Sequence, residues 1–230
     1  MLSWLRGRAE GPGRRDKYGR AEGPGGRDRY GRQSGEPSSE ERWLVVGLGN
    51  PGSEYGGTRH NVGAQAVRAL GARLGLPLTP NKRVRCEVAE ARDGEVRLVL
   101  AVPMSYMNDS GGPVRQAASW YKIPPRRIVV LHDELDLEVA TVRLKLGGGT
   151  AGHRGLDDLV RSLGTRDFAR VRIGVGRPPG RSEAADHVLR RFSSREQAEI
   201  DVALQEAADA VLGLVHEGLE PTQNRIHRRR

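Results

Sequence analysis

Two short apolar runs, each followed at once by a polar motif, constrain the fold of this chain more than any other feature. Leu44–Val46 leads into GLGNPGSEYGGTRHN (Gly47 to Asn61), and Ile128–Leu131 leads into HDELDL (His132 to Leu137). Short, fully apolar runs are typical of buried central strands. In an open α/β sheet, the carboxyl ends of such strands border the crevice where ligands bind. The sequence therefore predicts an α/β fold whose site combines the two motifs.

The rest of the body alternates strand-like and helix-like segments. Asp93-Gly94 is a hairpin signal, so the two strands that it joins should be antiparallel, whereas the other strands are expected to be parallel. We therefore predict a single domain with a twisted mixed β-sheet flanked by helices. Asp109 or Ser110 is expected to N-cap the second helix. The expected strands are 43–47, 82–91, 96–102, 128–131, 141–146 and 168–175, and the expected helices are 62–74, 110–121, 153–163 and 194–214.

The first 41 residues differ from the body in composition. Residues 7–18 and 19–30 are a tandem repeat of twelve that is rich in Gly, Pro and Arg. Such a segment has too little apolar surface to offset the entropy lost on ordering. We expect residues 1–41 to be a disordered extension and residues 42–230 to be the catalytic domain. The extension is either dispensable, which we favour, or a weak contact for RNA.

Charge and cysteine content narrow the class of protein. The net charge is +9, and the first 40 residues hold 9 Lys+Arg and 6 Asp+Glu, so the body keeps +6. A basic body favours a polyanionic partner, nucleic acid before membrane. Cys86 is the only cysteine, which excludes an intramolecular disulfide and a thiolate metal cluster. No run approaches the length of a membrane span and no secretory signal is recognisable, so we expect a cytoplasmic protein without membrane contact.

The glycines of GLGNPG match the GxGxxG pattern of dinucleotide-binding proteins at Gly47, Gly49 and Gly52. That function requires a helix that begins at the glycines and an acidic residue about 20 residues further on. Pro51 lies inside the turn, the next helix is expected to begin only near Asn61, and no acid stands at the required distance. A tight turn that brings the backbone close to a ligand explains the motif better.

Four polar side chains are expected at strand ends: Asn50, His60, Asn108 and Asp133. A histidine titrates near neutral pH, and a carboxylate that orients it makes it a usable general base. The chain has no GxSxG motif, and Cys86 lies within a predicted strand, so no covalent nucleophile is available. The His and acidic residues do not show the HExxH spacing of a zinc site, so no metal is expected. These features predict a hydrolytic site in which histidine activates water.

Two further stretches point to a nucleotide ligand. In PMSYMNDSG, the amide of Asn108 can donate to a carbonyl and hold a water, and Tyr106 can stack on a base or ribose. LKLGGGTAGHRGL is a glycine-rich loop that opens a helix, and helix N-termini attract phosphate. Lys145 and Arg154 flank this loop and Arg172 lies on the next strand, so together they predict a phosphate site.

From about Leu44 to His227, the sequence resembles the bacterial peptidyl-tRNA hydrolases. The resemblance rests on GLGNPGSEYGGTRHNVG, PMSYMNDSG, HDELDL, LKLGGG, GHRGL, RVRIGVGRPPG and the closing QNRIH, in this order. It implies a monomeric, cofactor-free esterase that cleaves the ester between a peptide and the 3′ ribose of tRNA. Such an enzyme acts in translation and ribosome rescue, because it recycles tRNA after abortive synthesis.

The resemblance also implies residue roles. His60 would be the general base, Asp133 would orient it and stabilise its protonated form, and Asn50 would contact the substrate near the ester. The remaining implied site consists of Tyr55, Tyr106 and Asn108 around the tRNA 3′ end and peptide, of Lys145 and Arg172 as a clamp on the tRNA 5′ phosphate, and of His153 and Arg154 as further substrate contacts.

Three positions depart from the family pattern, and Arg154 is the most consequential. The family usually reads GHNGL where this chain has Gly152-His153-Arg154-Gly155-Leu156, and arginine lacks the acceptor that asparagine offers. Thr150 and Ala151 also replace residues more usual as a charged residue or His and as Gly. A non-catalytic or altered-specificity RNA-binding paralogue on the same fold is therefore the alternative to the esterase.

Overall fold

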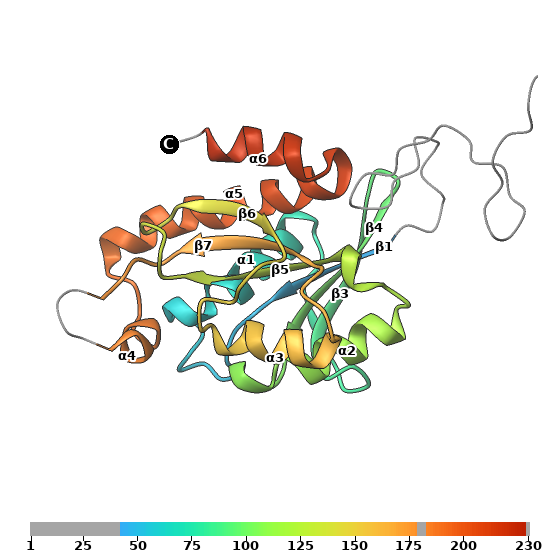
Figure 1. Cartoon of the computed structure of the whole chain (residues 1–230), viewed down its shortest axis with the longest axis horizontal. Coiled ribbons are helices and arrows are strands. Elements are labelled where there is room, and N and C mark those ends of the chain that lie inside the picture. Colours follow the sequence, from blue (N-terminus) through green and yellow to red (C-terminus); the bar gives the residue numbers. More distant parts are fainter. Residues whose placement is uncertain (1–41, 179–182, 229–230) are drawn as a thin grey trace, which may run out of the picture. The chain divides into compact units, whose positions relative to one another are not determined.

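The computed structural model describes residues 42–178 and 183–228 (Figure 1), so the expectation for residues 1–41 lies outside the described residues. In this part, seven strands form one sheet in the order β2-β3-β4-β1-β5-β7-β6. The strands are β1 Arg42–Gly47, β2 Thr79–Asn81, β3 Cys86–Asp93, β4 Val96–Pro103, β5 Ile128–Glu134, β6 Val142–Leu146 and β7 Ala169–Gly174. The helices are α1 Val62–Arg73, α2 Gly111–Trp120, α3 Arg154–Leu163, α4 Ala184–Val188, α5 Ser194–Glu217 and α6 Leu219–His227.

Pairing in the sheet confirms most of the predicted topology and corrects one strand. β1 pairs in parallel with β4 and β5, β5 pairs in parallel with β7, and β3 and β4 form the expected antiparallel hairpin. The prediction that β6 is parallel was wrong, because β6 pairs antiparallel with β7. A parallel return after β5 needs a crossover of about a dozen residues or more. The link from Glu134 to Val142 is shorter than that, so β6 runs opposite to β5.

The sheet is buried on both faces, which explains the continuous apolar runs of β1 and β5. Leu44 and Val46 of β1 and Ile128 and Val130 of β5 belong to the core cluster formed with α2 and α3. The alternate residues face α1 and α5, which pack against each other on the opposite face. Gly63 lets α1 pack closely against β5, because a Cβ at this position would lie 2.2 Å from the carbonyl oxygen of Leu131. The central strand ends are therefore fixed between two helical layers.

The N-terminus of α2 is capped differently from the prediction. Ser110 makes no side-chain cap to the helix, and its Oγ donates to the carbonyl of Met107. Asp158 of α3 instead accepts the N–H of Gly111 at 2.7 Å through Oδ2. A carboxylate is favourable at this positive helix end, and Asp158 is 5% exposed. The cap therefore comes from a neighbouring helix, which a local sequence pattern does not reveal.

The two edge strands, β2 and β6, limit pairing with a further strand in different ways. β2 has three residues and contains Pro80, which has no N–H to offer. β6, the other edge, lies against α6. Gln223 Nε2 donates to the carbonyl of Leu144 at 3.0 Å, and the Leu144 N–H donates to His227 Nε2 at 3.0 Å. Side chains of α6 thus form hydrogen bonds with backbone groups of the edge strand β6.

None of the helices in the described part is long and apolar enough to cross a membrane.

Candidate active site

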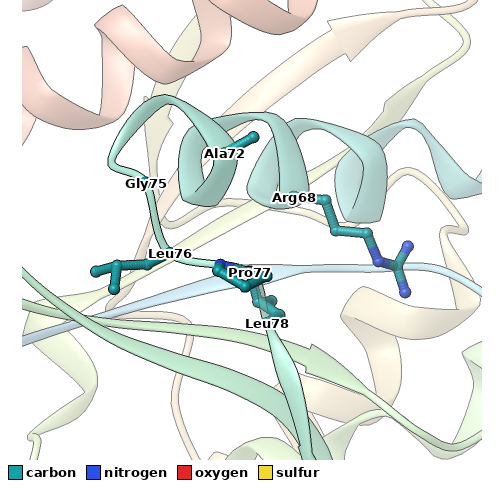
Figure 2. A pocket seen from close by; sticks show the side chains of 6 residues that line it. All are labelled: Arg68, Ala72, Gly75, Leu76, Pro77 and Leu78. Carbon is teal, nitrogen blue, oxygen red and sulfur yellow. The ribbon is translucent and has the colours of Figure 1, made fainter.

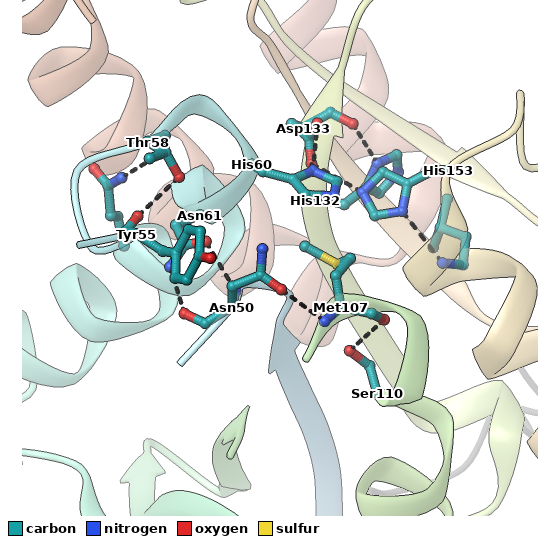
Figure 3. Close-up of polar contacts among 12 residues, drawn as sticks. Asn50, Tyr55, Thr58, His60, Asn61, Met107, Ser110, His132, Asp133 and His153 are labelled. Carbon is teal, nitrogen blue, oxygen red and sulfur yellow. Dashed lines mark hydrogen bonds and ion pairs between the residues drawn. The ribbon is translucent and has the colours of Figure 1, made fainter. Parts of the chain in front are cut away.

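Three side chains from separate segments meet at the carboxyl end of β5. His60 lies in the 3₁₀ turn Arg59–Asn61 before α1, Asp133 lies in β5, and His153 precedes α3. His60 Nδ1 is 2.9 and 3.0 Å from the two carboxylate oxygens of Asp133, and His153 Nε2 is 2.8 Å from its Oδ1. Figure 3 shows these contacts. The sequence prediction paired His60 with Asp133, and the structure adds a second histidine to the carboxylate.

The hydrogen bonds assign a tautomer to each ring. His153 Nδ1 accepts the N–H of Leu156 at 3.3 Å, so Nε2 carries the proton that is donated to Asp133. His60 Nδ1 faces the carboxylate and therefore donates to it. In a neutral imidazole this leaves a lone pair on His60 Nε2, which has no hydrogen-bond partner among the described residues. Because the His60 side chain is 13% exposed, this lone pair can accept a proton from a water.

The carboxylate of Asp133 stays ionised in this site. Burial alone would raise its pKa, but the charges and N–H donors of His153 and His60 outweigh burial and lower the pKa well below its usual range. The neighbouring His132 behaves in the opposite sense, because burial lowers its pKa to about 3. His132 Nδ1 donates to the carbonyl of Asp133 at 2.7 Å, and its Nε2 is buried without a partner among the described residues. His132 is thus a neutral structural group beside the charged pair.

Asn50 presents its amide toward the same site in a fixed orientation. Its Oδ1 accepts the N–H of Met107 at 2.8 Å, which identifies Nδ2 as the outward group. Its backbone is held by Asn61, whose Oδ1 accepts the Asn50 N–H and whose Nδ2 donates to the Asn50 carbonyl, both at 2.8 Å. Figure 3 shows the Asn50 Nδ2 without a dashed contact. Asn50 can therefore donate two hydrogen bonds to a ligand.

The ligand-like atoms of His60, Asp133 and His153 lie within 4.8 Å of one another, which is close enough to consider a metal. A metal ligand must offer a lone pair. Both nitrogens that face Asp133 carry hydrogens, and the Leu156 N–H keeps His153 in this tautomer. These donors suit a hydrogen-bonded carboxylate better than a metal centre.

A cationic face lies beside the site on β6 and β7. Arg143 lies opposite Arg172, and Lys145 lies opposite Arg170. Residues opposite each other in a ladder share a face, as do alternate residues of one strand, so all four cations project to the same side. Glu134 of β5 accepts from Arg172 Nε at 2.9 Å. The face thus combines four cations with one carboxylate.

Lys145 and Arg172 keep groups available for an anion. Glu134 holds the Nε side of Arg172, and its two Nη groups have no hydrogen-bond partner among the described residues. Lys145 lies over Gly148, where a Cβ would be 3.0 Å from Nζ. The register places Arg172 opposite His132, one residue from Asp133. Arg172 therefore lies on the strand next to the one that carries Asp133, and its side chain shares the face of His132 and Glu134.

Arg170 fixes the glycine-rich loop that links this face to α3. Its guanidinium, in a residue that is 4% exposed, donates to the carbonyls of Gly147 and Gly149. Gly147 and Gly148 have φ of 56° and 82°, which glycine adopts at little cost. Ala151 has φ 52°, an unfavourable conformation for a residue with a Cβ. The loop is thus held by Arg170 at one end and strained at the other.

The remaining predicted residues lie on the surface around this centre. Tyr106 is 57% exposed and Asn108 is also exposed, and the two flank the residue that holds Asn50. Tyr55 is half-buried, and its carbonyl accepts the Thr58 hydroxyl at 2.8 Å. Arg154 is exposed at the first position of α3. The structure thus places Tyr106 and Asn108 beside Asn50 and Arg154 beside His153.

Sequence analysis did not single out Asn61, Glu134 or Arg170. Glu134 lies in the motif HDELDL, but the strand was expected to end at Leu131, so the face that Glu134 shares with His132 became clear only from the longer β5. Asn61 and Arg170 act through backbone groups that lie 11 residues or more away along the chain, and no local pattern reports such contacts.

A separate hollow of about 420 Å³ lies at the end of α1 (Figure 2). Its lining is mostly apolar and includes none of the predicted site residues. The lining residues are Arg68, Ala72, Gly75, Leu76, Pro77 and Leu78. It therefore adds no general base or nucleophile to the site.

An open α/β sheet with a histidine–aspartate pair at a central strand end defines an enzyme-type site in which histidine can activate water. The sequence model described as "Peptidyl-tRNA hydrolase" matches residues 44–230. The peptidyl-tRNA hydrolase of Frankia alni is 52% identical over 191 residues, which cover 83% of this chain and 96% of that protein. That of Mycobacterium tuberculosis is 50% identical over 187 residues, 81% and 98% of the two chains.

A solved structure of a peptidyl-tRNA hydrolase also matches this chain. The crystal structure of peptidyl-tRNA hydrolase from Acinetobacter baumannii superposes with a TM-score of 0.77 at 38% identity, covering 84% of this chain and 98% of that one. The chain belongs to the peptidyl-tRNA hydrolase family. The resemblance noted from its motifs and the predicted α/β sheet are both confirmed.

Proposed function

We propose that this protein hydrolyses the ester between a peptide, or another N-blocked aminoacyl group, and the 3′ ribose of tRNA. The observation that carries the proposal is the contact between His60 Nδ1 and the Asp133 carboxylate, which leaves His60 Nε2 open to water. Family membership supplies the substrate class, and the cationic face beside the pair suits a nucleic acid.

The geometry supports a direct attack by water. His60 Nε2 removes a proton from water as its oxygen bonds to the ester carbonyl carbon, and the buried carboxylate of Asp133 stabilises the imidazolium. Asn50 Nδ2 and the amide of Asn108 donate to carbonyl oxygens of the substrate, where negative charge develops. When the tetrahedral intermediate collapses, the C–O bond to ribose breaks and the imidazolium returns its proton to the ribose oxygen. The products are tRNA with a free ribose hydroxyl and a carboxylic acid, which releases its proton to solvent.

Several residues serve binding in this proposal. Lys145 and Arg172 bind the 5′ phosphate of tRNA, while Tyr55 and Tyr106 contact its 3′ end and the peptide. Both ring nitrogens of His153 are hydrogen-bonded, one to Asp133 and one to the Leu156 N–H. His153 therefore contacts the substrate through the carbon edge of its ring or its backbone at the start of α3. No cofactor takes part in this proposal, and the protein acts as a cytoplasmic monomer.

The test is hydrolysis of N-acetyl-aminoacyl-tRNA compared with free aminoacyl-tRNA. His60→Ala should lower kcat by roughly 10²–10⁴, because a positioned base is lost. Asp133→Asn should also lower kcat while the protein stays folded. Arg73→Ala removes a surface ion pair with Asp209 away from the site and serves as the control, with kcat expected to match the wild type. Near wild-type kcat in His60→Ala would refute the assignment, and tRNA binding without any hydrolysis by the wild type would favour the RNA-binding alternative.

Arg154 is proposed to retune the site rather than abolish it. Its guanidinium stands at the positive end of α3, which is unfavourable unless an anion is bound. We infer that phosphates of the tRNA 3′ end are this anion. Arg154→Asn should then raise both kcat and KM, most visibly at low ionic strength, where charge contacts are strongest. A lower kcat in Arg154→Asn, or unchanged values of both kcat and KM, would refute this interpretation.

Residues 1–41 are proposed to be dispensable for chemistry, and residues 42–230 are proposed to be the catalytic domain. Deletion of the first 41 residues should leave kcat and Tm nearly unchanged and should weaken tRNA binding only modestly. A large fall in Tm would contradict the proposal.

A further inference from the structure

Arg59, the residue immediately before His60, is buried although it carries a charge. It is 7% exposed, and its side chain reaches the segment between α4 and α5. Its Nη2 donates to Glu196 Oε1 at 2.7 Å, and its Nη1 donates to the carbonyls of Arg190 and Arg191. A buried charge is stable only when it is paired and hydrogen-bonded in this way.

Phe192 and Ser193 complete the surroundings of the Arg59 guanidinium. The guanidinium carbon lies 4.8 Å from the centre of the Phe192 ring, a cation–π distance. Ser193 donates to Glu196 through both its N–H and its hydroxyl, each at 2.7 Å. Burial alone would raise the pKa of Glu196, but the hydrogen bonds from Ser193 and Arg59 lower the pKa below its ordinary value. The acceptor of Arg59 is therefore itself ionised and held in place.

The backbone repeats this connection. The Arg59 N–H donates to the Arg190 carbonyl at 3.0 Å, and Thr58 forms a β-bridge with Arg191. The 3₁₀ turn that carries His60 has no side-chain cap of its own. Contacts of Thr58 and Arg59 to residues 190–196 therefore hold one side of the turn, while Asn61 holds the other through the Asn50 backbone.

We propose that Arg59 is a positioning residue that holds His60 against Asp133 by anchoring the 3₁₀ turn to the start of α5. It is not a contact for tRNA phosphate, because its Nη groups are already occupied and its side chain is 8% exposed. The inference rests on the proposed function for its kinetic test, but the hydrogen bond between His60 and Asp133 can be followed without turnover.

The experiment compares Arg59→Ala, Arg59→Lys and a control, Arg73→Ala. Arg73 lies at the other end of α1 and also pairs with a carboxylate of α5, Asp209, at 2.7 Å. The readouts are kcat and KM on N-acetyl-aminoacyl-tRNA and the NMR signal of the His60 Nδ1–H, assigned with His60→Asn.

Arg59→Ala should lower kcat by about 10- to 100-fold with KM changed less than about twofold, because small displacements of a catalytic group can cost this much. The His60 Nδ1–H signal should broaden or shift. Arg59→Lys should recover part of both, and Arg73→Ala should match the wild type in both. A purely structural role would lower Tm without changing kcat or the signal well below Tm.

An unchanged kcat and an unchanged signal in folded Arg59→Ala would overturn the proposal, as would equal losses in Arg73→Ala. If Arg59→Ala does not fold, Glu196→Gln removes only the charged acceptor and must show a smaller loss of the same kind. Wild-type behaviour of Glu196→Gln would then count against the proposal. If the wild type itself does not hydrolyse the substrate, the proposed function is refuted. The NMR comparison still decides whether Arg59 positions His60.

Discussion

His132 should make the stability of this protein depend on pH in the acid range. Its side chain is buried, and burial lowers its pKa from the usual value of about 6.5 to about 3. Between these two values the unfolded chain binds a proton that the folded chain does not. Stability is therefore lost as pH falls below 6.5, and the loss grows until the pH nears 3.

The magnitude follows from this difference. One pKa unit corresponds to about 1.4 kcal/mol, so between pH 7 and pH 4.5 the contribution of His132 is about 2–3 kcal/mol against folding. His132→Asn removes the titration and keeps a donor that can reach the Asp133 carbonyl, which His132 Nδ1 now contacts at 2.7 Å. Any packing loss in the variant is the same at both pH values and cancels in the comparison.

Urea unfolding of wild type and His132→Asn at pH 7 and pH 4.5 measures the effect. The unfolding free energy of the wild type should fall by about 2–3 kcal/mol more than that of the variant over this interval. An equal fall in both proteins would refute the argument, because it would mean that His132 binds its proton equally in the folded and unfolded states.

Other substitutions test the loop, the layer contact and the clamp. Ala151→Gly should stabilise the protein by up to about 1 kcal/mol, since φ is 52° there, and a lower Tm would contradict this. Gly63→Ala should prevent folding, because its Cβ would meet the Leu131 carbonyl, and a variant with wild-type Tm would show that the helix can move. Lys145→Ala and Arg172→Ala should each reduce the salt dependence of tRNA binding by about one phosphate contact with kcat retained, and unchanged slopes in both would exclude the clamp.

Local patterns were sufficient for the elements that carry the site. The apolar runs before Gly47 and His132 identified β1 and β5 as buried central strands, and the structure shows that the two are neighbours. The proximity of His60 to Asp133 could be expected because Asp133 lies at the carboxyl end of β5 and His60 lies in the segment that leads from β1 into α1. These inferences use only neighbours in sequence and the rule that strand ends share an edge.

Features that depend on contacts between distant segments were not predictable in the same way. α2 takes its cap from Asp158 of α3, and β6 reverses direction because of a short link that carries no turn motif. α6 is only nine residues long, and its apolar spacing is weak, so it was not expected as a helix. The second histidine on Asp133 was missed because His153 stands 20 residues away and its tautomer depends on the Leu156 N–H.

The contact between α6 and the outer strand has a consequence for self-association. An uncovered strand edge is a template on which another chain can add a strand, and this is a common route to aggregation. Gln223 and His227 occupy the Leu144 carbonyl and N–H, so this template is blocked by side chains rather than by a further strand. His227 can accept the Leu144 N–H only while its Nε2 is unprotonated. A chain shortened before Leu219 would therefore leave the Leu144 carbonyl and N–H at the sheet edge open to another strand.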